Sequence, residues 1–141
     1  MKLAKIKLST SELTTIILEE YKPNENINLA ITRKEFEKEC SGLFKKFENI
    51  INKFIKDYSI NKGNISEVIL IGGSTFIPKI RSIIKTIFSK SEIKTDLNPI
   101  ETVAKGAAIL GGIISNLSYV NNINLLDVTN LTLGVNVYLK E

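Results

Sequence analysis

The sequence predicts an α/β protein in which a β-hairpin and a long helix precede a strand, a glycine turn and a further helix. Two observations carry this prediction. Within residues 8–31, Ile27, Leu29 and Ile31 alternate with Asn28 and Ala30, and apolar residues recur every three or four positions after Thr32. A continuous apolar run at residues 68–71 leads directly into Gly72 and Gly73. The chain of 141 residues is long enough for one buried core.

The composition excludes several kinds of active site and partner. The chain has no His and only Cys40, so it cannot build a Ser-His-Asp triad, a Cys-His pair, a His-containing or four-Cys zinc site, or an internal disulfide. The net charge of +4 comes from lysines scattered among glutamates, which predicts no nucleic-acid partner. No apolar run approaches the roughly 18 residues of a membrane span, so no membrane partner is expected. No targeting signal is visible, and cytoplasmic localisation is the default expectation.

Residues 8–31 are predicted to form the hairpin. Its first strand alternates Leu13, Thr15 and Ile17 with side chains of the opposite face. The connecting residues 21–26 have turn chemistry, because Pro fixes φ and Asn tolerates a left-handed backbone. A two-stranded hairpin is marginal by itself and must therefore pack against another element.

The next element is predicted to be an amphipathic helix of roughly two dozen residues. Thr32 and Glu35 form a capping box at its start, and Gly63 supplies a permissive turn after its end. Its apolar stripe is expected to be core rather than a cofactor site, and consists of Phe36, Cys40, Leu43, Phe44, Phe47, Ile50, Ile51, Phe54 and Ile55.

Residues 68–71 are predicted to be a strand buried on both faces of a parallel sheet. Gly72 and Gly73 follow it, and Pro78 marks the first turn of a helix. Two glycines at such a turn let a backbone pass close to a ligand, and the helix that follows favours phosphate. The same turn serves equally well to reverse the chain, so these residues alone leave both interpretations open.

A further helix is predicted after Pro99, with Asn98 and Glu101 as its capping box. Small residues on one face allow a close approach of backbone or ligand, namely Ala104, Ala107, Ala108, Gly111 and Gly112. After Asn116 the pattern becomes that of a linker, and residues 131–137 alternate as a new strand.

Several spaced motifs together resemble one known family. The longest is the segment 67–78, EVILIGGSTFIP. The others are Ala4-Lys5 with Leu8-Ser9, Ile31-Thr32-Arg33 with Phe36-Glu37, Leu43-Phe44, Asn98-Pro99 with Glu101, Val103-Ala104 with Gly106-Ala107-Ala108, and Leu125 to Thr129. This set resembles the 70-kilodalton heat-shock chaperones of the actin-like ATPase superfamily, and the resemblance covers essentially the whole chain.

The resemblance implies a fragment of lobe II of an actin-like ATPase domain, which has a ribonuclease H-like fold. Residues 1–40 correspond to part of subdomain IIB and 41–117 to part of subdomain IIA with its adenosine motif. Residues 118–127 correspond to the interdomain linker and 128–141 to the first strand of the peptide-binding domain. On this alignment the phosphate loops, the catalytic lysine and the carboxylates that organise Mg²⁺ lie outside the chain, which is therefore expected to be inactive alone.

The resemblance also implies which residues bind ATP or ADP. Lys5 and Ser9 are expected toward the base and ribose, with Gly72, Gly73 and Ser74 at the ribose and phosphate edge and Phe76 beside the adenine. No catalytic or metal-binding residue is expected. In the linker, Leu125, Leu126 and Asp127 are implied to couple the nucleotide state to peptide release, although their pattern alone favours plain strand or core leucines.

Four positions in the implied site depart from the family pattern. The family has an acid at position 2, arginine at 6 and 76, and Asp at 100, where this chain has Lys2, Ile6, Phe76 and Ile100. Phe76 can still stack on a base. Loss of the acids at 2 and 100 is expected to weaken binding by about 1 kcal/mol each. In the linker, Asn124 replaces a leucine and is expected to weaken hydrophobic docking.

The resemblance predicts a part of an ATP-dependent chaperone whose partners are unfolded polypeptides, J-domain co-chaperones and nucleotide-exchange factors. One alternative is a divergent relative that acts as a nucleotide-exchange partner or holdase without needing ATP hydrolysis. A third is a partner-docking α/β module, since the hairpin and the helix after Thr32 form the surface that exchange factors grip in the family.

Overall fold

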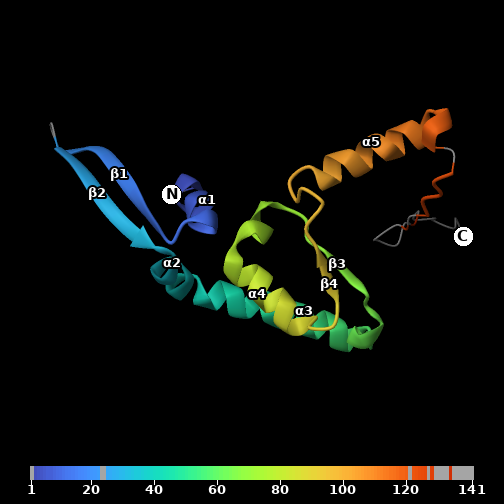
Figure 1. The fold of residues 1–141 in the computed structure, drawn as a ribbon, viewed down its shortest axis with the longest axis horizontal. Helices are drawn as coiled ribbons and strands as arrows, with labels where there is room; N and C mark the ends of the chain where they lie inside the picture. Colours follow the sequence, from blue (N-terminus) through green and yellow to red (C-terminus); the bar gives the residue numbers. More distant parts are fainter. Residues whose placement is uncertain (1, 23–24, 121, 127, 129–133, 135–141) are drawn as a thin grey trace, which may run out of the picture. The chain divides into compact units, whose positions relative to one another are not determined.

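The computed structural model describes residues 2–22, 25–120, 122–126, 128 and 134 (Figure 1). It divides into two compact units, one ending at Val103 and the other beginning at Ala104. In chain order the elements are α1 (Lys2–Thr10), β1 (Leu13–Lys22), β2 (Glu25–Thr32), α2 (Arg33–Glu39), α3 (Ser41–Asp57), η1 (Lys62–Asn64), β3 (Glu67–Ile69), η2 (Gly73–Phe76), α4 (Pro78–Ile87), β4 (Glu92–Lys94), α5 (Thr102–Ile114) and η3 (Ser118–Val120).

Strands β1 and β2 pair antiparallel, which confirms the predicted hairpin. Their regular register runs from Leu13 opposite Thr32 to Leu18 opposite Ile27. Residues 23–24 of the predicted turn lie outside the described residues.

The prediction that the hairpin begins at residue 8 was wrong, because residues 8–10 are the last turn of α1. This helix contacts β1. It buries Ala4 and Leu8, which are one turn apart, and Thr14 on β1 is buried as well. A helix of 9 residues with two inward apolar positions gives too weak a periodicity to detect in the sequence.

The predicted capping box at the start of α2 is confirmed. The Thr32 hydroxyl accepts the Glu35 N–H at 3.2 Å, and Glu35 Oε2 accepts the Thr32 N–H at 2.8 Å. Two orphan amide groups at the helix start are satisfied reciprocally in this way.

The prediction of one continuous helix was wrong, because Cys40 interrupts it with φ −86° and ψ 5°. Helix α2 ends at Glu39 and α3 begins at Ser41. The pair Ser41 and Gly42 has low helix propensity, and Gly/Ser pairs are frequent sites of helix kinks.

The expected core stripe of α3 is only partly buried. Phe44 is buried, whereas Leu43, Ile50 and Phe54 are 68%, 59% and 54% exposed. Helix α3 packs against α4, which covers only part of a wide apolar face. The left-handed residue after α3 is Ser59, at φ 50°, and the predicted role of Gly63 as the permissive turn residue was wrong.

The strand and helix around the glycine turn form a complete βαβ unit. Strands β3 and β4 pair in parallel, with α4 between them in the chain and Pro78 at its first position as predicted (Figure 1). Strand β4 was missed because three residues are too few to show a pattern. Lys94 Nζ lies 3.0 Å from Glu92 Oε2 and 3.1 Å from Glu67 Oε1, and hydrogen bonds to these carboxylates raise the pKa of Lys94.

Burial on both faces was wrong for residues 68–71. Leu70 is buried at 8% exposure, but its neighbours Ile69 and Ile71 are 53% and 54% exposed. Residues two positions apart in extended chain share one face, and the face that carries Ile69 and Ile71 is largely uncovered in the described part of the chain.

Helix α5 begins at Thr102, later than predicted, because Asn98 organises a turn before it. Asn98 Oδ1 accepts the Ile100 N–H at 3.1 Å, and Asn98 Nδ2 donates to Glu101 Oε1 at 2.9 Å. Among the small residues of α5, Gly112 is buried, and a Cβ there would lie 3.3 Å from Val120 Cγ2. The predicted close approach is therefore confirmed at this glycine.

The capping box predicts a pH-dependent contribution to stability. Hydrogen bonds from the backbone and hydroxyl of Thr32 lower the pKa of Glu35 from its usual value of 4.5. A carboxyl with a lowered folded pKa adds stability above its unfolded pKa and loses it as the pH falls through the folded value. We expect Glu35→Gln to lower the urea midpoint at neutral pH, with the difference closing below the usual pKa, as measured by circular dichroism. Glu37→Gln is the control, and a pH-independent difference would contradict the assignment.

Candidate functional site

A cavity of about 380 Å³ lies between α1 and the glycine turn. This volume falls within the usual range of small-molecule sites, about 300–1,000 Å³. Its lining consists of Lys2, Lys5, Ile6, Ser9 and Thr10 from α1, Gly73 and Phe76 from η2, and Ile77 and Ile100.

Helical spacing explains the α1 wall. Lys2, Lys5, Ile6 and Ser9 recur at intervals of three and four and so share one face of the helix. The buried Ala4 and Leu8 lie on another face. One short helix thus buries Ala4 and Leu8 on one face and presents its lysines and hydroxyls, together with Ile6, to the cavity.

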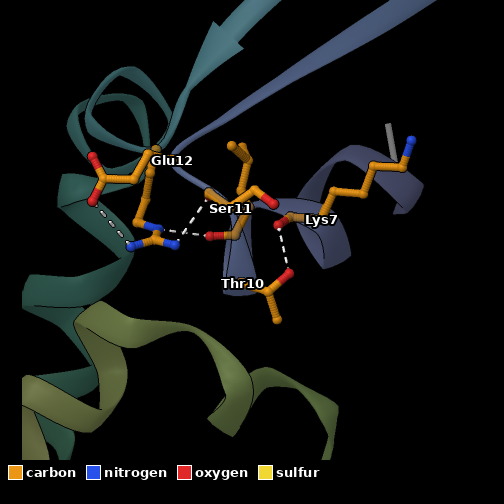
Figure 2. Close-up of polar contacts among 6 residues, drawn as sticks. Lys7, Thr10, Ser11 and Glu12 are labelled. Atoms are coloured by element: carbon orange, nitrogen blue, oxygen red, sulfur yellow. Dashed lines mark hydrogen bonds and ion pairs between the residues drawn. The ribbon is translucent and has the colours of Figure 1, made fainter.

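Arg33 fixes the end of α1 through contacts with Leu8, Ser11 and Glu12, and Figure 2 labels the last two of these residues. Its Nε donates to the Leu8 carbonyl at 2.7 Å and its Nη2 to the Ser11 carbonyl at 3.0 Å, while Nη1 lies 3.6 Å from Glu12 Oε1. The Arg33 N–H also donates to the Glu12 carbonyl at 2.8 Å. Carbonyls at a helix C-terminus lack intrahelical partners, and a cation there also complements the helix dipole. Sequence reasoning missed this role of Arg33.

The opposite wall depends on the conformation of Gly72. This residue has φ 86° and ψ 149°, a region that is essentially restricted to glycine. Its N–H donates to the Pro99 carbonyl at 2.8 Å, and its carbonyl accepts the Thr75 hydroxyl at 2.8 Å. The turn is thereby tied to the segment that carries Ile100.

Phe76 is held from outside the cavity by Arg81. The Arg81 guanidinium carbon lies 5.7 Å from the centre of the Phe76 ring, and Arg81 Nε donates to the Thr75 carbonyl at 2.7 Å. Arg81 does not line the cavity, whereas Phe76 does and remains 37% exposed. The aromatic ring is therefore a supported wall with an accessible surface.

The charged groups that line the cavity are both cationic, Lys2 and Lys5. The hydroxyl of Ser9 donates to the Lys5 carbonyl at 3.3 Å, and that of Thr10 to the Lys7 carbonyl at 3.2 Å. Among the residues that the structure describes, no acidic or amide side chain lines it. The cavity thus combines an apolar and aromatic floor with positive charge, which suits a planar ligand that carries an anionic group.

The structure gathers four of the six predicted nucleotide-binding residues around this cavity, namely Lys5, Ser9, Gly73 and Phe76. Gly72 and Ser74 stand in the same turn but do not line it. Lys2, Ile6 and Ile100, noted in the sequence as departures from the family pattern, line it too, and Thr10 and Ile77 were missed.

The predicted linker residues lie in the second unit. Leu125 and Leu126 are 55% and 89% exposed, and Asp127 lies outside the described residues. The predicted strand at 131–137 also lies outside them, apart from Gly134.

The described residues contain neither a cluster of metal-ligating side chains nor a membrane-spanning helix. No three or more His, Cys, Asp or Glu side chains gather there as a metal site would require. Nor do the helices in that part of the chain include one with the length and apolarity to span a bilayer.

Comparison with known proteins identifies the family of this α/β chain. The sequence model of the Hsp70 protein family matches residues 1–140, and the chain belongs to this family, whose members bind ATP and ADP with Mg²⁺. It is 41% identical over 135 residues to the mitochondrial iron-sulfur cluster biogenesis chaperone of Saccharomyces cerevisiae. The match covers 96% of this chain and 20% of the yeast protein, so the chain spans about a fifth of that relative's length.

The two glycines of the turn are predicted to respond differently to substitution. Gly72→Ala forces a side chain into a backbone region that costs about 1–3 kcal/mol. Gly73→Ala is expected to change stability by less than about 0.5 kcal/mol, because a Cβ there meets nothing within 4 Å. Urea unfolding of both variants tests this, and equal destabilisation would contradict the role given to Gly72.

Loss of the Arg33 fork is predicted to release α1. A lysine cannot reproduce donors aimed at both the Leu8 and Ser11 carbonyls, so Arg33→Lys should cost about 1.5–3 kcal/mol and speed amide hydrogen exchange within α1. Lys34→Arg exchanges the same residue types at the adjacent position and is the control. Unchanged exchange in α1 would refute the anchoring role of Arg33.

Proposed function

We propose that this chain contributes the adenosine side of the nucleotide site in an ATP-dependent chaperone of the Hsp70 family. The proposal includes a fragment of lobe II of an actin-like ATPase domain. Its segments are part of subdomain IIB at 1–40, part of subdomain IIA at 41–117, the interdomain linker at 118–127 and the first strand of the peptide-binding domain at 128–141. The helix interruption at Cys40 supports the first boundary. The division into compact units at residues 103–104 falls inside the second segment and is a separate feature.

The observation that carries the proposal is the cavity between α1 and the glycine turn. Lys5 and Phe76 are 71 positions apart in the sequence (76 − 5), yet both line the same space. The family resemblance implies a nucleotide-binding role for both residues, and Ser9 and Gly73, which have the same implied role, line the cavity with them. Its volume, aromatic wall and lysines suit a nucleoside that carries phosphate.

Each wall has a role in this proposal. Phe76 stacks on the base, while Lys5 and Ser9 contact the base and ribose. The turn at Gly72, Gly73 and Ser74 brings backbone close to the ribose and phosphates, where a side chain would intrude. Mg²⁺ would be held by carboxylates elsewhere in the longer chaperone, with no metal ligand supplied from this chain.

The proposed partners are those of the chaperone as a whole: unfolded polypeptides, J-domain co-chaperones and nucleotide-exchange factors. Leu125, Leu126 and Asp127 would form the linker that couples ATP binding to peptide release. The high exposure of Leu125 and Leu126 supports this role, because docking requires apolar side chains that are available to a second surface.

One observation favours the alternative of a relative that does not need ATP hydrolysis. Within the described part of the chain, no acidic or amide side chain lines the cavity to hydrogen-bond a nucleoside. The discriminating evidence is the sequence that precedes this segment in its gene. An intact first phosphate loop and its lysine favour an ATPase, whereas degraded versions favour an exchange partner or holdase.

The proposal predicts weak but specific contact with ADP. Fluorescent ADP titrated into the 141-residue chain should not saturate in the micromolar range, because the phosphate side of the site is not supplied. At millimolar ADP, saturation-transfer NMR should detect the adenine and ribose protons. Lys5→Ala should reduce this signal.

Lys7→Ala is the matched control, because Lys7 is on the same helix but does not line the cavity. Absence of any transfer, or an equal effect of both lysine variants, would overturn the proposed site. Saturation at micromolar ADP would show instead that the adenosine side suffices for binding.

A further inference from the structure

The cavity beside α1 contains few groups that distinguish one purine from another. Adenine offers an amino donor and a ring-nitrogen acceptor where guanine offers a carbonyl acceptor and N–H donors. A site built to hydrogen-bond one such edge rejects the wrong ligand by about 10⁴–10⁵, whereas an apolar pocket discriminates by only about 10–200-fold. The side chains that line the cavity therefore determine how selective it is.

Acceptors aimed at a base are scarce in this lining. Among the described residues that line it there is no carboxylate and no amide. The hydroxyls of Ser9 and Thr10 donate to carbonyls of α1 and keep lone pairs that can accept from the amino group of adenine or from the N–H groups of guanine alike. The two ammonium groups, Lys2 and Lys5, are donors on flexible stems, and both purines carry acceptors that such donors can reach. Neither lysine therefore selects adenine over guanine.

The aromatic and apolar residues of the lining do not distinguish the hydrogen-bonding edge of adenine from that of guanine. Phe76 presents an aromatic face, and stacking of a base on an aromatic side chain contributes about 1–3 kcal/mol with little dependence on which base it is. Arg81 packs on this ring and bonds the Thr75 carbonyl, so the stacking surface is already positioned. Ile6 and Ile100 add apolar contact without hydrogen-bonding groups.

We propose that this cavity takes purine nucleoside diphosphates by stacking on Phe76 and by apolar contact, with little selection between adenine and guanine. This inference rests on the proposed nucleotide site and adds its ligand specificity. Phe76 is the residue on which both ligands depend.

The test is competition between ADP and GDP for the 141-residue chain, followed by saturation-transfer NMR up to millimolar nucleotide. The expected result is that both bind, with dissociation constants within about tenfold of each other. If ADP binds and GDP is more than about 100-fold weaker, the inference falls and the nucleotide site stands. If neither nucleotide binds, the nucleotide site itself is refuted, and the inference with it.

Variants of Phe76 test the stacking directly. Phe76→Leu retains an apolar side chain without the aromatic face and should weaken ADP and GDP by the same factor, about 5–100-fold. Phe54→Leu is the matched control, because Phe54 is also exposed but stands on α3, outside the cavity. An equal loss in both variants, or a loss for ADP alone, would overturn the role of Phe76. The ADP-to-GDP ratio of the unaltered chain decides the question even where a variant fails to fold.

Discussion

The candidate site depends most on the hydrogen bonds that the Arg33 guanidinium donates to the backbone at the end of α1. Isolated helices shorter than about 12–15 residues are marginal in water, and α1 has 9 residues with Ala4 and Leu8 as its buried side chains. Its position must therefore come from tertiary contacts. The bonds from Arg33 to the Leu8 and Ser11 carbonyls join the end of α1 to the start of α2, and they act where the helix leaves its carbonyls unpaired. Because α1 supplies both lysines of the cavity, Arg33 positions the site without lining it.

The second wall is positioned by the same kind of contact. Arg81 donates to the Thr75 carbonyl and packs on Phe76, as Arg33 donates to the carbonyls that end α1. The chain has two arginines and both brace backbone beside the cavity, whereas the abundant lysines include the charged groups that line it. The planar fork of arginine can satisfy two fixed acceptors, while a lysine on its flexible stem adapts to a ligand. This division explains why the scarce residue type is structural here.

The local features of the fold were predictable and the long-range ones were not. The capping box of Thr32 and Glu35 and the first-turn position of Pro78 depend on residues within a few positions, so the sequence contains their full cause. Helix α1 depends on Arg33, which follows Leu8 by 25 positions, and β4 depends on pairing with β3. For Ile69 and Ile71 the error runs the other way, because the sequence predicted burial and both side chains are exposed. Their pattern is that of a strand covered on both faces, and the chain, which spans about a fifth of its yeast relative, presents a two-stranded sheet in its described part.

The same distinction applies to the site, where the sequence identified several of the residues that line the cavity but neither of the two arginines that hold its walls. Lys5, Ser9, Gly73 and Phe76 were chosen by their positions in family motifs, and all four line the cavity. The supports escaped detection because their partners are the carbonyls of Leu8, Ser11 and Thr75, and every residue carries a carbonyl. A hydrogen bond to a backbone carbonyl does not require any particular residue type at the acceptor, so the sequence does not reveal it. Loss of a support would move a whole wall, whereas a change in a lining residue such as Ile100 alters only the surface of the cavity, so the lining of the cavity and the position of its walls can change independently.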